Sequence, residues 1–193
     1  MRNGIYINLT NRCTNHCTFC IRNEGAGVYG SDSLWLDREP TAKEVLDDLG
    51  KYDFSKYNEV VFCGYGEPTI RIEELCDVAR GIKAMCSLPI RINTNGQGNL
   101  IHGRDITPMF EGIVDIVSIS MNTADAESYA EVCKPAYGEA AYQAVLDFGL
   151  CASKHVPEVI FSVVRTTIPD EDIEKCRVLA EKYGGKLRVR ELD

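Results

Sequence analysis

Short runs rich in Val and Ile alternate with helical runs along the whole chain, and this alternation restricts the possible folds more than any other feature. Runs of this kind are typical of parallel strands that are buried on both faces. Strands separated by helices form βα units with right-handed crossovers. The sequence therefore predicts an α/β fold built on a parallel sheet. The six predicted strands are Ile5–Thr10, Glu59–Cys63, Pro89–Thr94, Val114–Met121, Val159–Val164 and Leu187–Arg190.

The helical runs between these strands carry start and stop signals. Thr41 and Glu44 have the spacing of a capping box, so a helix is expected to begin at Pro40-Thr41. Gly184-Gly185 ends the last predicted helix. The other expected helices are Ile72–Cys86 with an apolar face, a weaker one near Thr107–Gly112, one over about Gly138–Ser153, and one that opens after Pro169-Asp170.

The length of the chain limits the barrel that these units can build. A closed eight-stranded barrel takes ~250 residues, and this chain has 193. We therefore expect a partial, open (βα)6 barrel of the TIM type that forms a single domain over residues 1–193. In such a fold the chemistry lies at the carboxyl ends of the strands.

Composition limits where in the cell the protein can work and which kinds of partner it can bind. The net charge is −8, from 21 Lys and Arg against 29 Asp and Glu, so general nucleic-acid binding, which needs clustered cations, is not expected. No apolar run approaches the ~20 residues that span a bilayer, and the N-terminus lacks the apolar stretch of a signal peptide. We therefore expect a cytoplasmic protein without membrane association. Nine cysteines in such a chain indicate metal or redox chemistry instead of a disulfide framework.

Three of the cysteines form a Cx3Cx2C motif directly after the first predicted strand: Cys13, Cys17 and Cys20. A random chain of this composition would contain the spacing only about 0.02 times. A 4Fe–4S cluster normally takes four thiolates, so three would leave one iron open or served by a distant ligand. A structural zinc site with His16 as the fourth ligand is the alternative, although zinc sites usually pair two CxxC units and only one is present.

The same motif, with Phe19 before its third cysteine, resembles the radical S-adenosylmethionine (radical SAM) superfamily. Three further segments at predicted strand ends are similar to motifs of that family. They are Phe62–Pro68, which resembles its GGE motif, Ile92–Gly96, which resembles the TNG turn of activating-enzyme-type members, and Val117–Asn122. The details GYGEPT and CIRNEG…LWL look most like the small radical SAM proteins associated with TatD-family nucleases.

The resemblance implies a set of cofactors and a reaction. Cys13, Cys17 and Cys20 would hold a 4Fe–4S cluster, and S-adenosylmethionine would chelate its fourth iron. Reductive cleavage would yield a 5′-deoxyadenosyl radical that abstracts hydrogen from an unidentified substrate, which could be a small molecule, a peptide or a nucleotide. A flavodoxin or ferredoxin is the expected reductant. The residues expected to bind the cofactor are Gly64, Tyr65, Gly66, Glu67, Asn93, Thr94, Asn95, Ser118, Ser120 and Asn122.

Some positions depart from the family pattern. Asn93 stands where an Asp often contacts the ribose, and Ser118 and Ser120 stand where activating enzymes often have Asp and Lys. These departures weaken the case for a glycyl-radical-enzyme activase, which is the alternative within the superfamily. A non-SAM Fe–S electron carrier or a zinc-binding module is the alternative from another class. Ser162 and Arg165 fit a cofactor or substrate role and plain structural bonding equally well.

Two other features need an assignment. Gly25–Gly30 matches GxGxxG, but it lacks the preceding strand and following helix of a dinucleotide site, so we expect it to be a lid that Trp35 packs down. Cys63 precedes the glycine motif and could lie near the cluster. The cysteines on apolar helix faces are expected in the core: Cys76, Cys86 and Cys176.

Overall fold

A six-stranded parallel sheet with its strands in sequence order forms the centre of the computed structural model, which describes residues 3–23 and 33–191. The predicted GxGxxG segment lies outside these ranges. The first and last strands are the two edges of the sheet in the described part of the chain, so the α/β fold and the open six-unit barrel are confirmed. The strands are β1 (Gly4–Ile7), β2 (Glu59–Phe62), β3 (Ile90–Thr94), β4 (Ile116–Ser120), β5 (Glu158–Val164) and β6 (Lys186–Arg190).

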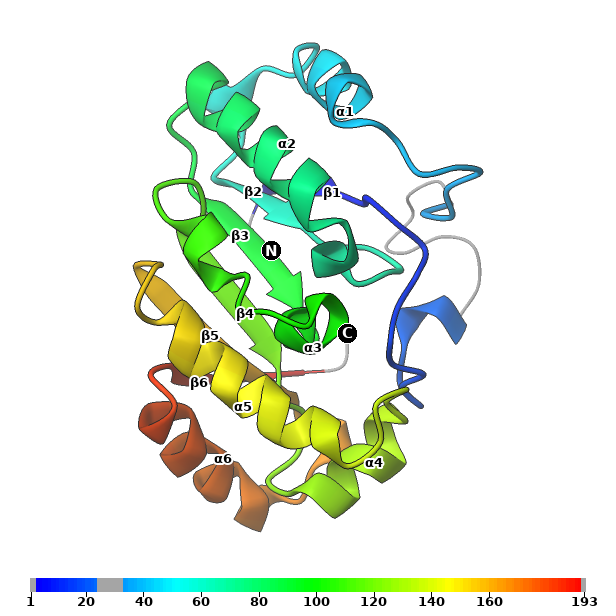
Figure 1. Ribbon diagram of the computed structural model, residues 1–193, viewed down its shortest axis with the longest axis vertical. Helices are drawn as coiled ribbons and strands as arrows, with labels where there is room; N and C mark the ends of the chain where they lie inside the picture. The colour runs from blue at the N-terminus through cyan, green and yellow to red at the C-terminus, as the bar shows by residue number, and fades with distance from the viewer. Residues whose placement is uncertain (1–2, 24–32, 192–193) are drawn as a thin grey trace.

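Helices follow the strands and cover one face of the sheet (Figure 1). The predicted capping box is present, because Thr41 Oγ1 accepts a hydrogen bond from Glu44 N and the Glu44 carboxylate accepts one from Thr41 N. The α-helices are α1 (Ala42–Leu49), α2 (Ile72–Met85), α3 (Gly98–His102), α4 (Ala126–Cys133), α5 (Ala140–Ala152) and α6 (Asp170–Lys182). Short 3-10 helices are η1 (Ile21–Asn23), η2 (Phe54–Lys56), η3 (Pro68–Arg71), η4 (Thr107–Phe110) and η5 (Arg165–Thr167).

The structure differs from the sequence prediction in two helical regions. The run near Thr107–Gly112 is only the 3-10 turn η4, and Gly112 with a φ of 75° lies beyond its end. Helices α3 and α4 were not predicted. The Asp125 side chain accepts a hydrogen bond from Ser128 N at the start of α4, which is a start signal that the sequence does contain.

The main hydrophobic core lies between the sheet and the helices. Strand residues such as Phe62, Ile92 and Phe161 pack there with Leu75 and Phe148. The alternate strand residues point to the other face, and several are buried polar groups: Glu59, Arg91, Ser118 and Ser162. They are buried because the sheet curves and its inner side chains cover one another, as in an open barrel. No helix within residues 3–23 and 33–191 is long and apolar enough to cross a membrane.

Candidate functional site

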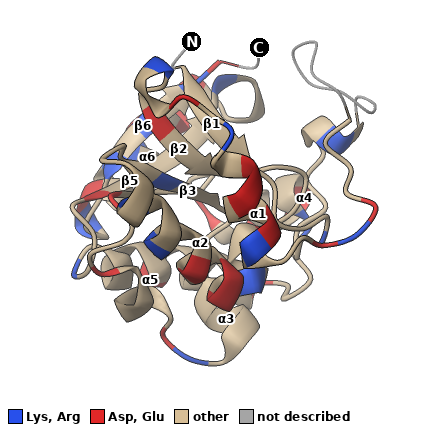
Figure 2. Ribbon diagram, turned by 90° about the horizontal axis from the view of Figure 1, so that it is seen from above, with Lys and Arg blue, Asp and Glu red and all other residues tan. Residues whose placement is uncertain are grey.

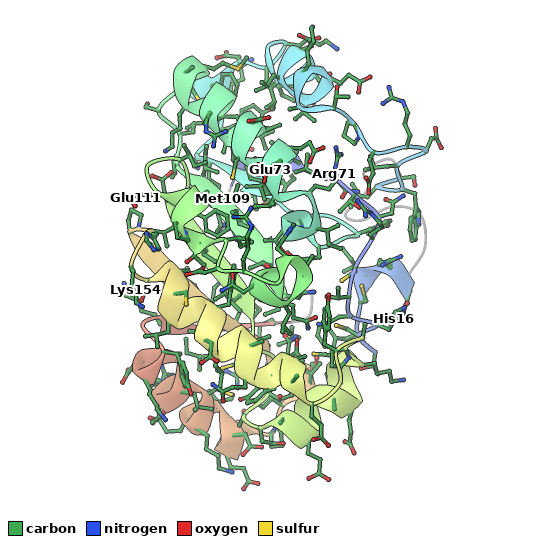
Figure 3. All side chains as sticks on the ribbon, viewed as in Figure 1. His16, Arg71, Glu73, Met109, Glu111 and Lys154 are labelled. Carbon is green, nitrogen blue, oxygen red and sulfur yellow. The ribbon has the colours of Figure 1, made fainter. Side chains whose placement is uncertain are left out.

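The segment that carries the three cysteines, residues 8–20, leaves the carboxyl end of β1 and reaches the end of α4; we call it the cysteine loop (Figure 1). His16 lies in this loop, at the edge of the molecule beside η1 (Figure 3). Backbone hydrogen bonds attach the loop to α4: His16 N donates to Cys133 O at 3.0 Å, and Thr18 N donates to Val132 O at 2.9 Å. The loop position is therefore set by a helix that is distant in the sequence.

A buried network of side-chain hydrogen bonds holds the cysteine loop in place. Asn15 Nδ2 and Gln97 Nε2 each donate to the Tyr129 hydroxyl at 3.1 Å, and Gln97 Nε2 also donates to Asn15 Oδ1 at 2.7 Å. Thr14 Oγ1 donates to Gln97 Oε1 at 2.7 Å and accepts from Asn95 Nδ2 at 2.8 Å. These bonds join the loop to the end of β3 and to α4. The sequence pattern did not indicate Gln97 or Tyr129.

Cys17 and Cys20 lie close enough to Cys13 to raise its pKa, and Cys17 also raises the pKa of Cys20. Burial, the Glu67 carboxylate and the two other cysteines together raise the pKa of Cys13 to about 11, because a thiolate there lacks a counter-cation. Hydrogen-bond donors nevertheless point at this sulfur, from Asn15 N at 3.5 Å and Asn95 Nδ2 at 3.8 Å. Burial also raises the pKa of Cys20, against a backbone hydrogen bond from Arg22. Thiolates backed by N–H donors fit the iron atoms of a cluster, which would supply the missing positive charge.

The geometry of the cysteines also bears on the zinc alternative. Among residues 3–23 and 33–191, no group of three or more His, Cys, Asp or Glu side chains is placed to hold one metal ion. A tetrahedral zinc ion needs its ligands around a single point. Each thiolate of a 4Fe–4S cluster instead binds a different iron atom, so the sulfurs are further apart. The described residues therefore give no support to the zinc alternative.

The segment Gly64–Glu67 packs directly against the cysteine loop. A Cβ atom on Gly64 would lie 2.4 Å from Asn8 Cγ, and one on Gly66 would lie 2.2 Å from Thr10 O. Glu67 N donates to Arg12 O at 2.8 Å. The two glycines are therefore needed for the close approach of the two loops, and their backbone is held next to the cysteines.

Aromatic contacts fix the rest of this region. The buried ring of Tyr65 packs on Trp35, with 4.8 Å between the ring centroids. The guanidinium of Arg22 lies 4.9 Å from the Trp35 centroid. Trp35 thus connects Gly64–Glu67 with η1, which follows the third cysteine. Whether it also packs down the GxGxxG segment falls outside the described residues.

The Glu67 carboxylate joins the ends of two strands. Its Oε1 accepts hydrogen bonds from Thr69 N at 3.0 Å, Thr69 Oγ1 at 2.6 Å and Thr94 Oγ1 at 2.7 Å. Its Oε2 accepts one from Asn95 N at 2.6 Å. Burial raises the pKa of Glu67, and these four hydrogen bonds act in the opposite direction. The predicted residues Glu67, Thr94 and Asn95 therefore lie together.

Asn93 belongs to a charged group on the inner face of the sheet. Its Oδ1 accepts from Arg91 Nη1 at 2.8 Å, while Arg91 makes a two-pronged ion pair with Glu59 at 2.9 and 3.0 Å. Ser118 is the register neighbour of Asn93 on β4. Burial raises the pKa of Cys63 to about 11, and the charged groups that also act on it are Arg91 and Glu59. Cys63 is thus placed beside this ion pair, which does not support a cluster-ligand role.

The row of polar side chains that Ser118 and Ser120 form on the inner face of β4 stops before Asn122. Strand β4 ends at Ser120, and Asn122 has a φ of 62°, so its side chain does not continue the row of Ser118 and Ser120. Its Nδ2 donates to Cys133 Sγ at 3.2 Å. Its buried Oδ1 has no hydrogen-bond partner among the described residues. A buried acceptor of this kind is suited to a donor group of a bound molecule.

Ser162 and Arg165 make structural bonds. Ser162 Oγ donates to Ile119 O at 3.4 Å inside the sheet. Arg165 pairs with Glu191 at 2.9 Å and with Asp170 at 2.8 Å at the end of β5. Of the cysteines expected in the core, Cys76 and Cys176 are fully buried, and Cys86 is half-buried against the same core.

Comparison with known proteins gives a consistent family match. The profile of the Radical SAM superfamily matches residues 7–180. The GTP 3',8-cyclase of Corynebacterium glutamicum is 30% identical over 194 residues, which cover 96% of this chain and 48% of the relative. That of Lactiplantibacillus plantarum is 26% identical over 162 residues, 83% of this chain and 45% of the relative. The chain thus spans about half the length of the curated relatives that it matches.

Solved structures share the fold at low sequence identity. Streptococcus suis SuiB bound to its precursor peptide SuiA has a TM-score of 0.73 at 14% identity, over all of this chain and 40% of SuiB. SuiB bound to S-adenosylmethionine has a TM-score of 0.71 at 14% identity, over all of this chain and 41% of SuiB.

Proposed function

The chain belongs to the radical SAM superfamily, whose members use a 4Fe–4S cluster and S-adenosylmethionine, and we propose that Cys13, Cys17 and Cys20 hold the cluster in this enzyme. The observation that carries this proposal is that the cysteine loop is fixed by the Asn15, Gln97 and Tyr129 side chains, with N–H donors 3.5 and 3.8 Å from Cys13 Sγ. The bound cofactors supply one-electron cleavage of S-adenosylmethionine to a 5′-deoxyadenosyl radical, which abstracts a hydrogen atom from the substrate.

The residues around the cysteine loop have separate tasks in this proposal. The backbone carbonyls of Gly64–Glu67, which packs against the loop, receive the ammonium group of S-adenosylmethionine. The polar groups at the ends of β3 and β4 bind its ribose and carboxylate, and the unpartnered Asn122 Oδ1 accepts a hydrogen bond from it. The ten residues concerned are Gly64, Tyr65, Gly66, Glu67, Asn93, Thr94, Asn95, Ser118, Ser120 and Asn122.

The substrate class that we propose rests on sequence similarity and not on the geometry of the site. The GTP 3',8-cyclases are named for a nucleotide substrate and are up to 30% identical over nearly the whole chain, so a nucleotide is the first class to test. SuiB, with its bound peptide, shares only the fold. The serines at positions 118 and 120 still weaken the activase alternative. We propose a flavodoxin or ferredoxin as the electron donor.

Anaerobic reconstitution tests the cluster assignment. The wild-type protein should be brown, hold about four irons and, once reduced, convert S-adenosylmethionine to 5′-deoxyadenosine. Cys17→Ala should lose the cluster and this cleavage because it lacks one ligand. Cys176→Ala is the matched control, since Cys176 is a fully buried cysteine of α6. Cleavage retained by Cys17→Ala, or a colourless protein that holds zinc, would overturn the proposal.

A further inference from the structure

Cys133, the last residue of α4, lies against one of the proposed cluster ligands. Its thiol is in hydrogen-bonding contact with the thiol of Cys17. The backbone on both sides of Cys17 holds this pair in place, because His16 N and Thr18 N donate to Cys133 O and Val132 O at 3.0 and 2.9 Å. Two sulfur atoms from distant parts of the chain are therefore kept together by the framework.

The two cysteines differ in access to solvent. Cys133 is fully buried, and Cys17 is half-buried. The Cys133 sulfur also accepts a hydrogen bond from Asn122 Nδ2 at 3.2 Å, which fixes its position inside the fold. Cys17 is thus the sulfur of the pair that a small molecule can reach, and Cys133 is the one held inside the fold.

The other core cysteines do not share these features. Burial raises the pKa of Cys76 to about 11 and that of Cys176 to about 12, so both are kept as neutral thiols. The Cys76 thiol is directed to Met109 O at 3.8 Å. Cys133 is therefore distinguished from ordinary core cysteines by its sulfur neighbour and by its hydrogen-bond donors.

We propose that Cys17 and Cys133 close to a reversible disulfide when the cluster is absent, and that this bond blocks cluster assembly until it is reduced. The inference rests on the proposed function, because Cys17 is there a cluster ligand. A disulfide removes this ligand and leaves only Cys13 and Cys20 in the loop. The pair would then protect the empty site from irreversible oxidation.

The oxidant in this scheme is a small-molecule disulfide such as oxidised glutathione. The Cys17 sulfur attacks it, forms a mixed disulfide and releases one thiol. The Cys133 sulfur then gives up its proton, attacks Cys17 Sγ and releases the second thiol. Two protein thiols are oxidised, one external disulfide is reduced, and the two protons end on the two released thiols.

Disulfide mapping on the cluster-free, full-length protein tests the pairing. The reduced protein is treated anaerobically with oxidised glutathione, alkylated and digested. We expect two of its nine thiols to be lost, with a cross-link between Cys17 and Cys133. A protease that cleaves after glutamate separates Cys133 from the cysteine loop at Glu131. Tandem mass spectrometry of the cross-linked peptides then identifies the cysteine that is bonded to Cys133. Cys176→Ala should form the same cross-link, and Cys133→Ala should form none.

Iron uptake tests the consequence and separates it from the proposed function. Oxidised wild-type protein should fail to take up iron until a dithiol reduces it, while Cys133→Ala should take up iron equally before and after oxidation. A bond confined to Cys13, Cys17 and Cys20, or loss of iron from unoxidised Cys133→Ala, would overturn the inference. The latter result would identify Cys133 as a cluster ligand. If the cross-link forms but reduced wild-type protein takes up no iron, the proposed function fails and the disulfide stands.

Discussion

Glu67 shows how a single residue of a family motif acquires a role from its surroundings. Its motif position suggests cofactor binding, and its carboxylate accepts four hydrogen bonds from Thr69, Thr94 and Asn95. The side chain therefore fixes the ends of β2 and β3 relative to each other. Its contribution to the cofactor site is first of all to position the neighbouring backbone.

The raised pKa of Glu67 predicts a pH dependence of stability. The folded protein holds this proton above about pH 4.3, where the unfolded chain releases it. Stability therefore falls as the pH rises from about 4.3 through the folded-state pKa, by about 1.4 kcal/mol for each unit of the shift. Glu67→Gln, which cannot ionise, should lack this loss. Urea unfolding of the cluster-free protein across this range measures it, with the exposed Glu73→Gln as control. If the free energy of unfolding depends on pH in the same way for wild type and Glu67→Gln, the prediction is contradicted.

At the scale of elements, the site depends on the contact between Gly64–Glu67 and the cysteine loop. Gly66 has no room for a side chain, because a Cβ atom would lie 2.2 Å from Thr10 O and 2.6 Å from Arg12 O. Both neighbours are backbone atoms and cannot move without shifting the loop. Any larger residue must separate the two segments.

Gly66→Ala should therefore lower the free energy of unfolding by about 2–4 kcal/mol and reduce iron uptake on reconstitution. Gly50→Ala is the matched control. A Cβ atom on Gly50, at the end of α1, would be 3.6 Å from its nearest neighbours, which is an ordinary contact. Urea unfolding and iron analysis on both variants give the comparison. Equal behaviour of the two variants would show that the close approach is not required.

Element prediction succeeded where the signals are local. The capping box of α1 and the glycine stop after α6 are both present, and Gly184 has a φ of 80°. Helix α4 was missed although Asp125 caps it, because its eight residues are fewer than the window of about 11–18 residues over which helical periodicity is read. This omission mattered, since α4 supplies Tyr129 and Cys133 to the site.

At the scale of the whole molecule, charge is distributed unevenly between the two faces of the sheet. Charged side chains of both signs lie on α1 (Figure 2), and α2 and α6 also carry both signs. The inner face instead buries Arg91 and Glu59 as an ion pair that joins β2 and β3. Such a pair costs free energy to desolvate, and its partners depend on each other. The prediction of a single domain over residues 1–193 stays a prediction.

Removing one partner of this pair should destabilise the protein strongly. Arg91→Met leaves Glu59 as a buried charge and should cost about 3–5 kcal/mol. The double variant Glu59→Gln/Arg91→Met should lose clearly less than the sum of the two single changes. A double-mutant cycle with urea unfolding measures this coupling. Additive losses would show that the pair contributes no mutual interaction.

The sequence by itself determined the fold class, the order of the six strands, and the position of the cysteine loop after the first of them. Those features follow from periodicity and motif spacing, which are local properties of the chain, and the resemblance of the motifs to a family added the cofactors. Only the tertiary structure decided that Glu67 ties two strands together, that Asn122 turns away from Ser118 and Ser120, and that Cys133 lies under Cys17. These contacts join residues as far apart as Asn15 and Tyr129, 114 positions along the chain. Only the packing of the segments after β1 and β3 against α4, at the carboxyl ends of the strands, brings these residues together.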